Sequence, residues 1–318
     1  YLAWQRRRNH WEAKSDWFRY TPGVVTAINL LIQAETEEGD GVLIQEPVYY
    51  PFGNSIRTQK RQVISSPLVL RDGRYEIDFA DFERKAADPM CRAFVLSNPH
   101  NPVGRVYTRE ELQRMGDICL KHNVFVIADE IHSDLIFPGH HHTVFASLGE
   151  AYAKNCAVCH APSKTFNLAG LSFSCIMIPD ETHRQRFDAM FNRYCRANPT
   201  FFAPVAAKAA WEHGEEWLKE CLAYIQGNEA FVRSFAEKTW GGKVWIAPLE
   251  GTYLLWMDLH ALEPDAEKLD RRMIEEAGVA LDGGTMFGQE GAGFQRINLA
   301  APRSIIREVM ERMAKAFA

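Results

Sequence analysis

Residues 155–170 read NCAVCHAPSKTFNLAG, a short apolar run that leads into a lysine between a serine and a threonine. Cys156, Cys159 and His160 spell C-x-x-C-H, the pattern that attaches c-type haem, and the C-x-x-C pair alone fits a redox dithiol. Lys164 follows the histidine in a segment that is otherwise poor in charge. The stretch therefore offers two kinds of chemistry, one based on thiols and one on an amine.

Outward from this stretch, short apolar runs alternate with helical patterns. The runs that fit buried strands are 42–44, 93–96, 124–128, 156–161 and 173–178. Residues 108–121 carry Leu112, Met115 and Cys119 at helical spacing behind a Thr-x-x-Glu capping box. This alternation predicts an α/β fold with a largely parallel sheet and helices on both faces. Such sheets hold ligands at the carboxyl ends of their strands.

Composition narrows the class of protein. The chain has 318 residues and a net charge of −5, so it can bury a large core and has no general basic surface for nucleic acid. No apolar stretch reaches the roughly 18 residues of a membrane span, and no secretory signal opens the sequence. Seven cysteines is an odd number for a disulfide framework. We expect a cytoplasmic protein that binds neither nucleic acid nor membrane.

The pattern of expected elements changes after residue 198. Long helical stretches at 203–219 and 221–238 come first, followed by expected strands at 252–259 and 294–299 and a closing helix at 304–318. We predict a large domain over residues 1–219 and a smaller C-terminal domain over 220–318. The opening residues resemble a helix already under way, so we expect that an N-terminal segment of the large domain is missing.

Polar clusters follow the expected strands and helix starts. In TPGVV, the free amides of Gly23, Val24 and Val25 can hold a phosphate, although an ordinary helix start explains the same residues. In EPVYYPF, Tyr49 and Tyr50 can lay a ring on a flat ligand or simply cover the core.

Two further clusters follow strands in the middle of the chain. In LSNPHNPVGR, doubled Asn-Pro pairs make a rigid turn that can hold the amide of Asn101 in one orientation. In VFVIADEIHSDL, Asp129 ends an apolar strand, and burying it there is costly unless a cation or donor meets it. His132 lies three residues further on, where a lone histidine can equally be a structural residue.

Together these groups match the needs of pyridoxal 5'-phosphate (PLP). That cofactor needs a lysine for its aldehyde, a carboxylate for its pyridinium nitrogen, donors for its phenolate oxygen, an aromatic ring and an anion site. The sequence offers each at a strand end, which favours Lys164 over the thiols. A haem or dithiol at Cys156 and Cys159 fits poorly, because positions three apart on a strand face opposite sides.

The chain also resembles a known family. PVYYPF, SNPHNPVGRVYTREEL, ADEIHSDL, APSKTFNLAGL and INLAAPRS are similar to the fold-type I PLP enzymes of the class I/II aminotransferase superfamily, and within it to the MalY/PatB group of cystathionine β-lyases. The likeness runs from Tyr1 to the C-terminus. It implies a PLP-dependent transferase-like large domain with a mostly parallel seven-stranded sheet, a smaller α+β domain, and a homodimer.

The resemblance also implies roles for individual residues. Lys164 is the lysine that binds the cofactor covalently, Asp129 is the partner of the pyridine nitrogen, and Asn101 is a donor to the phenolate oxygen that also meets the substrate. His132 stands where ordinary aminotransferases of the superfamily carry a tyrosine, which favours the lyases. Further residues implied to bind cofactor are Tyr49 against the ring and Gly23, Val24, Val25 and Ser163 at the phosphate.

Arg296 in FQRINLA is implied to bind the substrate carboxylate as a bidentate fork. An internal ion pair with an acid such as Glu250 is the alternative. Two departures from the family pattern concern the phosphate. Ser172 stands where a phosphate-binding arginine is common, and we expect the N-terminal segment that in this family supplies a tyrosine to the partner subunit's phosphate to be missing.

The function expected is a PLP-dependent carbon–sulfur β-lyase, which eliminates a thiol from an amino acid to give pyruvate and ammonia. A class I/II aminotransferase shares the steps up to the carbanion, and a non-catalytic interaction protein on the same fold is an alternative of another class. We expect no metal site, since residues His140, His141 and His142 follow a Pro-Gly turn without a ligand partner and fit a solvated loop.

Overall fold

The computed structural model describes residues 1–318 and contains a large sheet of seven strands. These are β1 (Phe18–Thr21), β2 (Gly41–Ile44), β3 (Gln62–Ser65), β6 (Cys91–Ser97), β7 (Phe125–Asp129), β8 (Cys156–His160) and β9 (Ser174–Met177). Their order is β1-β9-β8-β7-β6-β2-β3. The strands from β3 to β8 in this order run parallel, whereas β9 and β1 add antiparallel pairings at one edge. The predicted α/β fold with a mostly parallel seven-stranded sheet is confirmed.

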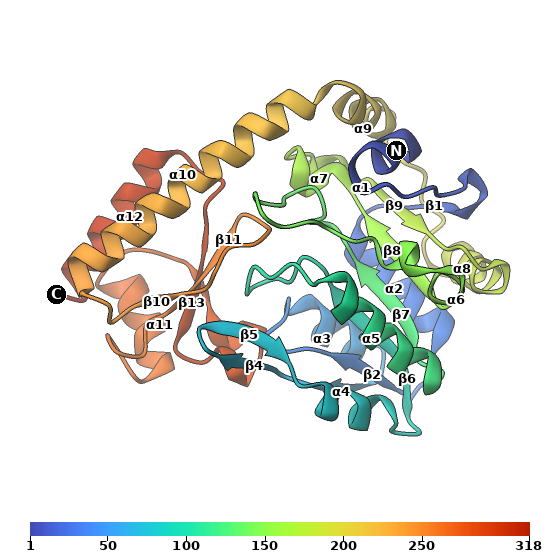
Figure 1. Ribbon diagram of the computed structural model, residues 1–318, viewed down its shortest axis with the longest axis horizontal. Helices are drawn as coiled ribbons and strands as arrows, with labels where there is room; N and C mark the ends of the chain where they lie inside the picture. Colours follow the sequence, from blue (N-terminus) through green and yellow to red (C-terminus); the bar gives the residue numbers. More distant parts are fainter.

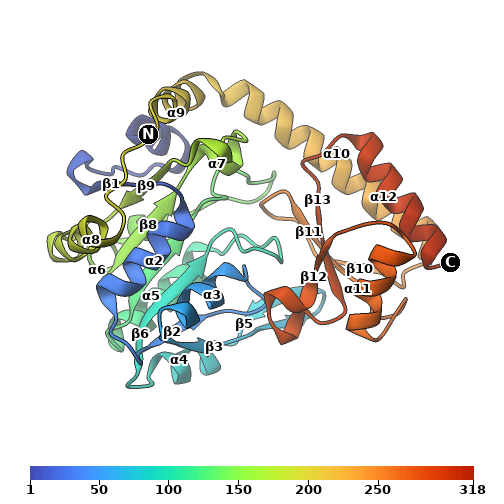
Figure 2. The same ribbon diagram turned by 180° about the vertical axis from the view of Figure 1, so that it is seen from behind.

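Helices cover both faces of this sheet. The face turned to the viewer in Figure 1 carries α4 (Phe79–Ala86), α5 (Arg109–Lys121) and α6 (Glu150–Lys154), and the opposite face in Figure 2 carries α2 (Val24–Glu35), α3 (Pro51–Thr58) and α8 (Glu181–Tyr194). Alternate strand residues feed two separate cores, with Phe94 and Val126 in one and Val95 and Ile127 in the other. This two-sided burial explains why the strands read as continuous apolar runs.

Helix α5 shows how local sequence sets an element boundary. The Thr108 side chain accepts from the backbone N–H of Glu111, and the Glu111 side chain accepts from the backbone N–H of Thr108. This reciprocal pair satisfies two otherwise free donors at the helix start, as the Thr-x-x-Glu pattern predicted. The helix predicted over 108–121 is therefore confirmed.

The smaller, C-terminal part holds a four-stranded antiparallel sheet in the order β10-β11-β13-β12. Its elements are β10 (Trp245–Ile246), β11 (Leu254–Asp258), α11 (Ala266–Glu275), β12 (Asp282–Gly283), β13 (Phe294–Asn298) and α12 (Arg303–Ala316). They share one core with the C-terminal half of α10 (Glu215–Trp240). None of the helices has the length and apolar character needed to cross a bilayer.

Helix α10 leads from one part of the molecule to the other, along the upper edge of Figure 1. It runs unbroken through residue 219, so the predicted break between helices at 219–221 is wrong. The break lies at Gly214, between α9 (Phe202–His213) and α10, where an added Cβ would collide with Phe166 and the Ala210 carbonyl. The domain boundary predicted near Lys219 lies inside α10 and stays a prediction.

The remaining elements lie around the two sheets. They are α1 (Leu2–Asn9), α7 (Pro162–Thr165), the hairpin strands β4 (Leu68–Arg71) and β5 (Arg74–Ile77), and the short 3-10 turns η1 (Ser15–Trp17), η2 (Phe145–Leu148), η3 (Ala169–Leu171), η4 (Gly284–Phe287) and η5 (Gln289–Gly291). The hairpin β4–β5 reaches from the large sheet to the C-terminal part, where Tyr75 Oη accepts from Trp256 Nε1 at 3.2 Å. The C-terminal part is thus held by a hairpin as well as by α10.

Candidate active site

A cavity of about 440 Å³ lies at the carboxyl ends of the central parallel strands, facing the C-terminal sheet. It is lined by 22 residues from both parts of the chain. All the predicted site residues are among them: Gly23, Val24, Val25, Tyr49, Asn101, Asp129, His132, Ser163, Lys164 and Arg296. Segments that are far apart in the sequence are therefore brought together at the sheet edge where such folds hold ligands.

Lys164 reaches the cavity from α7, a single turn that follows β8. Pro162 occupies the first turn of that helix, where its missing N–H costs nothing. Burial lowers the pKa of the Lys164 amine, Arg296 lowers it further, and Asp129 opposes both. A lysine with a lowered pKa is more often uncharged near neutral pH, so its lone pair is available to act as a nucleophile or to accept a proton.

Asp129 is the last residue of β7 and is buried. Its carboxylate accepts a hydrogen bond from the Ile131 N–H at 3.1 Å and forms no ion pair within the chain. Burial raises the pKa of Asp129 to about 7, although the Ile131 hydrogen bond and Lys164 act in the other direction. The cationic partner that the sequence predicted for this carboxylate is not supplied by a salt bridge of the chain, so a cationic ligand atom would be strongly favoured here.

His132 lies beside the same cavity, with its ring edge-on to Tyr253 at 5.6 Å between centroids. The ring is buried and its Nδ1 has no hydrogen-bond partner. Burial lowers the pKa of His132 to about 3, with further lowering by Lys164 and Arg296. His132 is therefore a neutral imidazole that can accept or donate one hydrogen bond.

The start of α2 also lines the cavity. Gly23 precedes the helix with φ of +140°, a conformation that residues with a Cβ rarely adopt. The first helical amides, including those of Val24 and Val25, have no acceptor within the helix, and the positive end of the helix dipole favours an anion. Ser163 and Ser172 line the cavity as well. The lining contains no arginine or lysine other than Lys164 and Arg296.

Tyr49 lies on the cavity wall, half-buried and next to Tyr50, with 5.5 Å between ring centroids. Burial raises the pKa of Tyr49, so the phenol stays protonated. Its neighbour Phe52 belongs to the buried core, edge-on to it at 5.8 Å. Tyr49 therefore presents an aromatic ring to the cavity, as a flat ligand requires, while Phe52 fills the core behind it.

Asn101 and Arg296 meet across the cavity. Arg296 Nη1 donates to Asn101 Oδ1 at 2.7 Å, which leaves the Asn101 amide nitrogen without an intrachain partner. Arg296 Nε also donates to Asp282 Oδ2 at 3.2 Å, and Nη2 donates to the same oxygen. The internal ion pair that was the alternative explanation of Arg296 is therefore present, with Asp282 as the acid. Glu250, the acid named as an example, pairs with Arg74 instead.

Sequence reasoning did not identify Asp282 and Tyr253 as residues of this cavity, although both line it. Asp282 belongs to an Asp-Gly-Gly run that has an ordinary explanation as a turn. Its position opposite Arg296 depends on the register of β12 with β13, which no local pattern specifies. Tyr253 comes directly before an apolar strand, and from the sequence it could equally be a core residue or a cavity residue.

The thiol chemistry suggested by C-x-x-C-H has no place in the structure. Cys156 packs into one core and Cys159 into the other, on opposite faces of β8. Burial raises the pKa of each thiol well above its usual range. Both sulfurs are thus inert and unable to bind one group together.

The histidine run differs from the prediction at one position. His142 is buried rather than solvated, and its Nε2 lies 2.9 Å from Glu130 Oε2. The acid is twelve residues away in sequence but adjacent in space, because the loop returns to the end of β7. No group of histidine, cysteine, aspartate and glutamate side chains in the chain is arranged to hold a metal ion.

The residues present fit PLP. One cavity is lined by five suitable groups. They are a buried carboxylate without a cation, a lysine with a lowered pKa, an asparagine with a free amide nitrogen, a half-buried tyrosine and a helix start. These are the donors and charges that the pyridine nitrogen, aldehyde, phenolate oxygen, ring and phosphate require. The buried Asp129 is the most specific of them, since its charged form needs a cation that the chain does not provide.

Comparison with known proteins agrees with this geometry. Residues 5–313 match the family model for aminotransferase class I and II. Cystathionine beta-lyase PatB of Bacillus subtilis is 40% identical over 99% of this chain and 81% of its own length. Protein MalY of Escherichia coli is 32% identical over 90% of this chain and 72% of its own length.

A solved structure carries the same fold. Cystalysin from Treponema denticola, whose crystal structure contains a pyridoxal 5'-phosphate cofactor, superposes with a TM-score of 0.97 at 40% identity, over 99% of this chain and 80% of that one. The expected cofactor is therefore PLP for this chain too. The chain belongs to the class I and II aminotransferase family of PLP-dependent enzymes and, within it, to the MalY/PatB group.

Proposed function

We propose that the protein is a carbon–sulfur β-lyase of the cystathionine β-lyase type, which eliminates a thiol from an amino acid and yields pyruvate and ammonia. The observation that carries the proposal is the placement of Lys164, Asp129 and Asn101 around one cavity in a chain that is 40% identical to PatB. Retention of this whole set argues against a non-catalytic protein on the same fold.

Each residue has a distinct task in this reaction. PLP, when bound, supplies an electron sink that stabilises negative charge at the substrate α-carbon. Asp129 holds the pyridine nitrogen protonated, and that cation in turn lowers the pKa of the buried carboxylate. The Lys164 amine takes the α-proton, because its lowered pKa leaves more of it unprotonated near neutral pH.

The substrate is held by the other side of the cavity. Arg296 and one N–H of the Asn101 amide bind the α-carboxylate, and the other N–H of that amide would serve the cofactor's phenolate oxygen. The substrate carboxylate replaces part of the contact that Arg296 makes with Asp282. The carbon–sulfur bond then breaks with its electron pair going to sulfur, which leaves as a thiol after protonation. Water hydrolyses the remaining fragment to pyruvate and ammonia, so no second oxo acid is consumed.

His132 favours a lyase over an aminotransferase by its chemistry. A neutral, buried imidazole does not carry the phenolic hydroxyl that ordinary aminotransferases of the superfamily place there, and its unpaired Nδ1 leaves one hydrogen bond to be made. We propose that His132 meets the cofactor rather than the substrate, since it lines the same cavity as Asp129 and packs against Tyr253.

We further propose a homodimer. The anion end of the cavity has backbone amides and serines but no cation apart from Lys164, which leaves room for a residue of a second copy. Exposed apolar side chains gather between α8 and α9, with Phe201 82% and Phe202 70% exposed. A patch of that kind marks an interaction surface. The free cysteines fit a reducing compartment, and we propose the cytoplasm.

The products separate the candidate activities. The protein is incubated with cystathionine or cysteine, with and without an added 2-oxo acid, while pyruvate, free thiol and new amino acid are followed. A β-lyase forms pyruvate and thiol in equal amounts without the oxo acid. An aminotransferase forms product only when the oxo acid is present, and a non-catalytic protein forms neither.

A further inference from the structure

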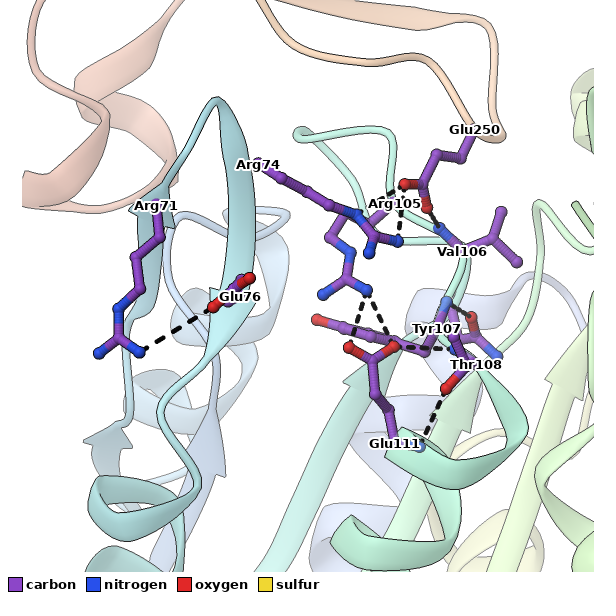
Figure 3. A network of polar contacts seen from close by, with 10 residues as sticks. Arg71, Arg74, Glu76, Arg105, Val106, Tyr107, Thr108, Glu111 and Glu250 are labelled. Carbon is purple, nitrogen blue, oxygen red and sulfur yellow. Dashed lines mark hydrogen bonds and ion pairs between the residues drawn. The ribbon is translucent and has the colours of Figure 1, made fainter.

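Glu250 is an acidic residue of the C-terminal part whose contacts lie almost entirely with the large domain. It is located between β10 and β11, and its side chain is only 5% exposed. Oε1 accepts from Arg74 Nε at 2.9 Å, and Oε2 accepts from the backbone N–H of Val106 at 2.8 Å. Figure 3 shows the carboxylate between the β4–β5 hairpin, which carries Arg74, and the loop that carries Val106.

The backbone around Glu250 makes the same connection. The N–H groups of Glu250 and Gly251 both donate to the Gly104 carbonyl at 3.0 Å. On the other side, the Phe137 N–H donates to the Glu250 carbonyl at 3.1 Å, and residues 136 and 251 form an isolated bridge. The segment is therefore wedged between the loop that carries Asn101 and the loop that follows His132.

Two glycines show how close this approach is. An added Cβ at Gly251 would come within 2.9 Å of Val106 Cγ2 and 3.1 Å of the Leu135 carbonyl. Gly104 has φ of +76°, and a Cβ added there would lie 3.2 Å from Leu249 Cδ1. The contact thus tolerates little displacement, and the buried carboxylate depends on both of its partners remaining in place.

The loop that Glu250 holds has a direct role in the cavity. Its residue Asn101 accepts from Arg296 Nη1 at 2.7 Å, and Arg296 comes from the C-terminal sheet. The Asn101 backbone N–H donates to Ser97 Oγ at 3.3 Å, at the end of β6. The orientation of Asn101 therefore depends on how the loop is placed relative to both parts of the chain.

We infer that Glu250 is a positioning residue for the active site: its carboxylate fixes the Asn101 loop against the C-terminal part and so sets where Asn101 and Arg296 meet. The inference rests on the proposed function only in the roles given to Asn101 and Arg296. Glu250 itself touches neither cofactor nor substrate.

The test is the variant Glu250→Gln, which keeps the shape but loses the charge that Arg74 needs. An amide donor at the phenolate oxygen stabilises its negative charge, so a displaced Asn101 raises the pH at which the cofactor's visible absorption changes. We expect the midpoint of this change in Glu250→Gln to rise by roughly half a pH unit or more, in the same direction as in Asn101→Ala. We also expect KM for amino-acid substrates to increase, because the position of Arg296 depends on the same contact.

Glu263→Gln is the matched control. Glu263 is likewise a buried glutamate of the C-terminal part, but it pairs with Lys268 and Arg272 and does not contact the large domain. We expect it to lower thermal stability without moving the spectroscopic midpoint. An unmoved midpoint in Glu250→Gln, or an equal shift in both variants, overturns the inference.

A second variant covers the case in which Glu250→Gln does not fold. Arg74→Gln removes the same ion pair from its more exposed end, and a smaller rise of the midpoint is expected. If Arg74→Gln leaves the midpoint unchanged, the ion pair does not position Asn101. The midpoint is read without substrate, so a protein that released no thiol would contradict the proposed function and leave this test intact.

Discussion

Arg296 reaches the cavity already paired with Asp282, the residue opposite it in the β12–β13 pairing. The Arg296 side chain is 11% exposed and that of Asp282 is 43% exposed, so the acid is the more solvated partner. Together with the bond to Asn101, this pair engages all three guanidinium nitrogens, through three of their five N–H groups. A ligand carboxylate therefore has to share the fork with Asp282 or displace it.

Replacement of this acid should tighten carboxylate binding. In Asp282→Asn the fork loses its only charged competitor, and we expect the affinity for simple monocarboxylates to rise by about three- to tenfold. This affinity is measured by titrating the PLP-loaded protein with an unreactive carboxylate and following the absorbance of the bound cofactor. Glu290→Gln removes one exposed charge nearby without touching Arg296 and should have no effect. Weaker binding in Asp282→Asn would mean that Asp282 mainly orients the fork.

Arg296→Lys should separate substrate affinity from cofactor retention. The lysine keeps the charge but cannot donate in parallel to a carboxylate, so kcat/KM should fall by roughly 30- to 100-fold. The cofactor should stay bound, as its visible absorption reports, because Arg296 meets the substrate side of the cavity. Loss of cofactor together with normal turnover in the folded fraction would instead assign Arg296 a structural role.

The buried Asp129 predicts how the cofactor-free protein responds to pH. Its pKa is raised from 3.8 to about 7 in the folded chain, so folding favours the protonated form. The raised pKa costs nothing at low pH, and stability is lost as pH rises toward 7. Asp129→Asn should therefore stabilise the cofactor-free protein by about 2–4 kcal/mol near pH 8 and by little near pH 4.

Urea unfolding of both proteins at the two pH values measures this difference. Added PLP should reduce the advantage of the asparagine variant, because a protonated pyridine nitrogen supplies the cation that the wild-type carboxylate lacks. A stability difference that did not depend on pH would show that Asp129 stays ionised in the cofactor-free protein.

The exposed aromatic patch predicts the oligomeric state. Light scattering should give the mass of a dimer, and replacing Phe201 and Phe202 together by serine should shift the protein toward monomer. Ile274→Ser is the control, since Ile274 is 62% exposed but lies on α11 in the C-terminal part. A wild-type protein that is monomeric and fully active would argue against a shared site.

Sequence reasoning reached the residues whose position follows from a strand end. Asn101, Asp129 and Lys164 each come shortly after an apolar run, and parallel strands deliver their carboxyl ends to one edge. The C-x-x-C-H pattern was resolved by the same local rule, because Cys156 and Cys159 face opposite sides of one strand.

Contacts between distant segments could not be predicted in the same way. Asp282 meets Arg296 through a strand register, Glu250 meets Arg74 through the placement of a hairpin, and His142 meets Glu130 through a returning loop. The residue types in each pair have ordinary local explanations, as a turn, a surface charge or a solvated loop. Only the tertiary structure sets these partners, within one part of the chain for Asp282 and His142 and between the two parts for Glu250.

The most direct test of the account is which residue carries the cofactor. The PLP-loaded protein is reduced with borohydride, digested, and the peptides are analysed by mass spectrometry, with Lys164→Ala as the control. We predict that the cofactor's added mass is found on the peptide that contains Lys164 and is absent from the variant. Its attachment to any other lysine, or its persistence in Lys164→Ala, would contradict the assignment of this site.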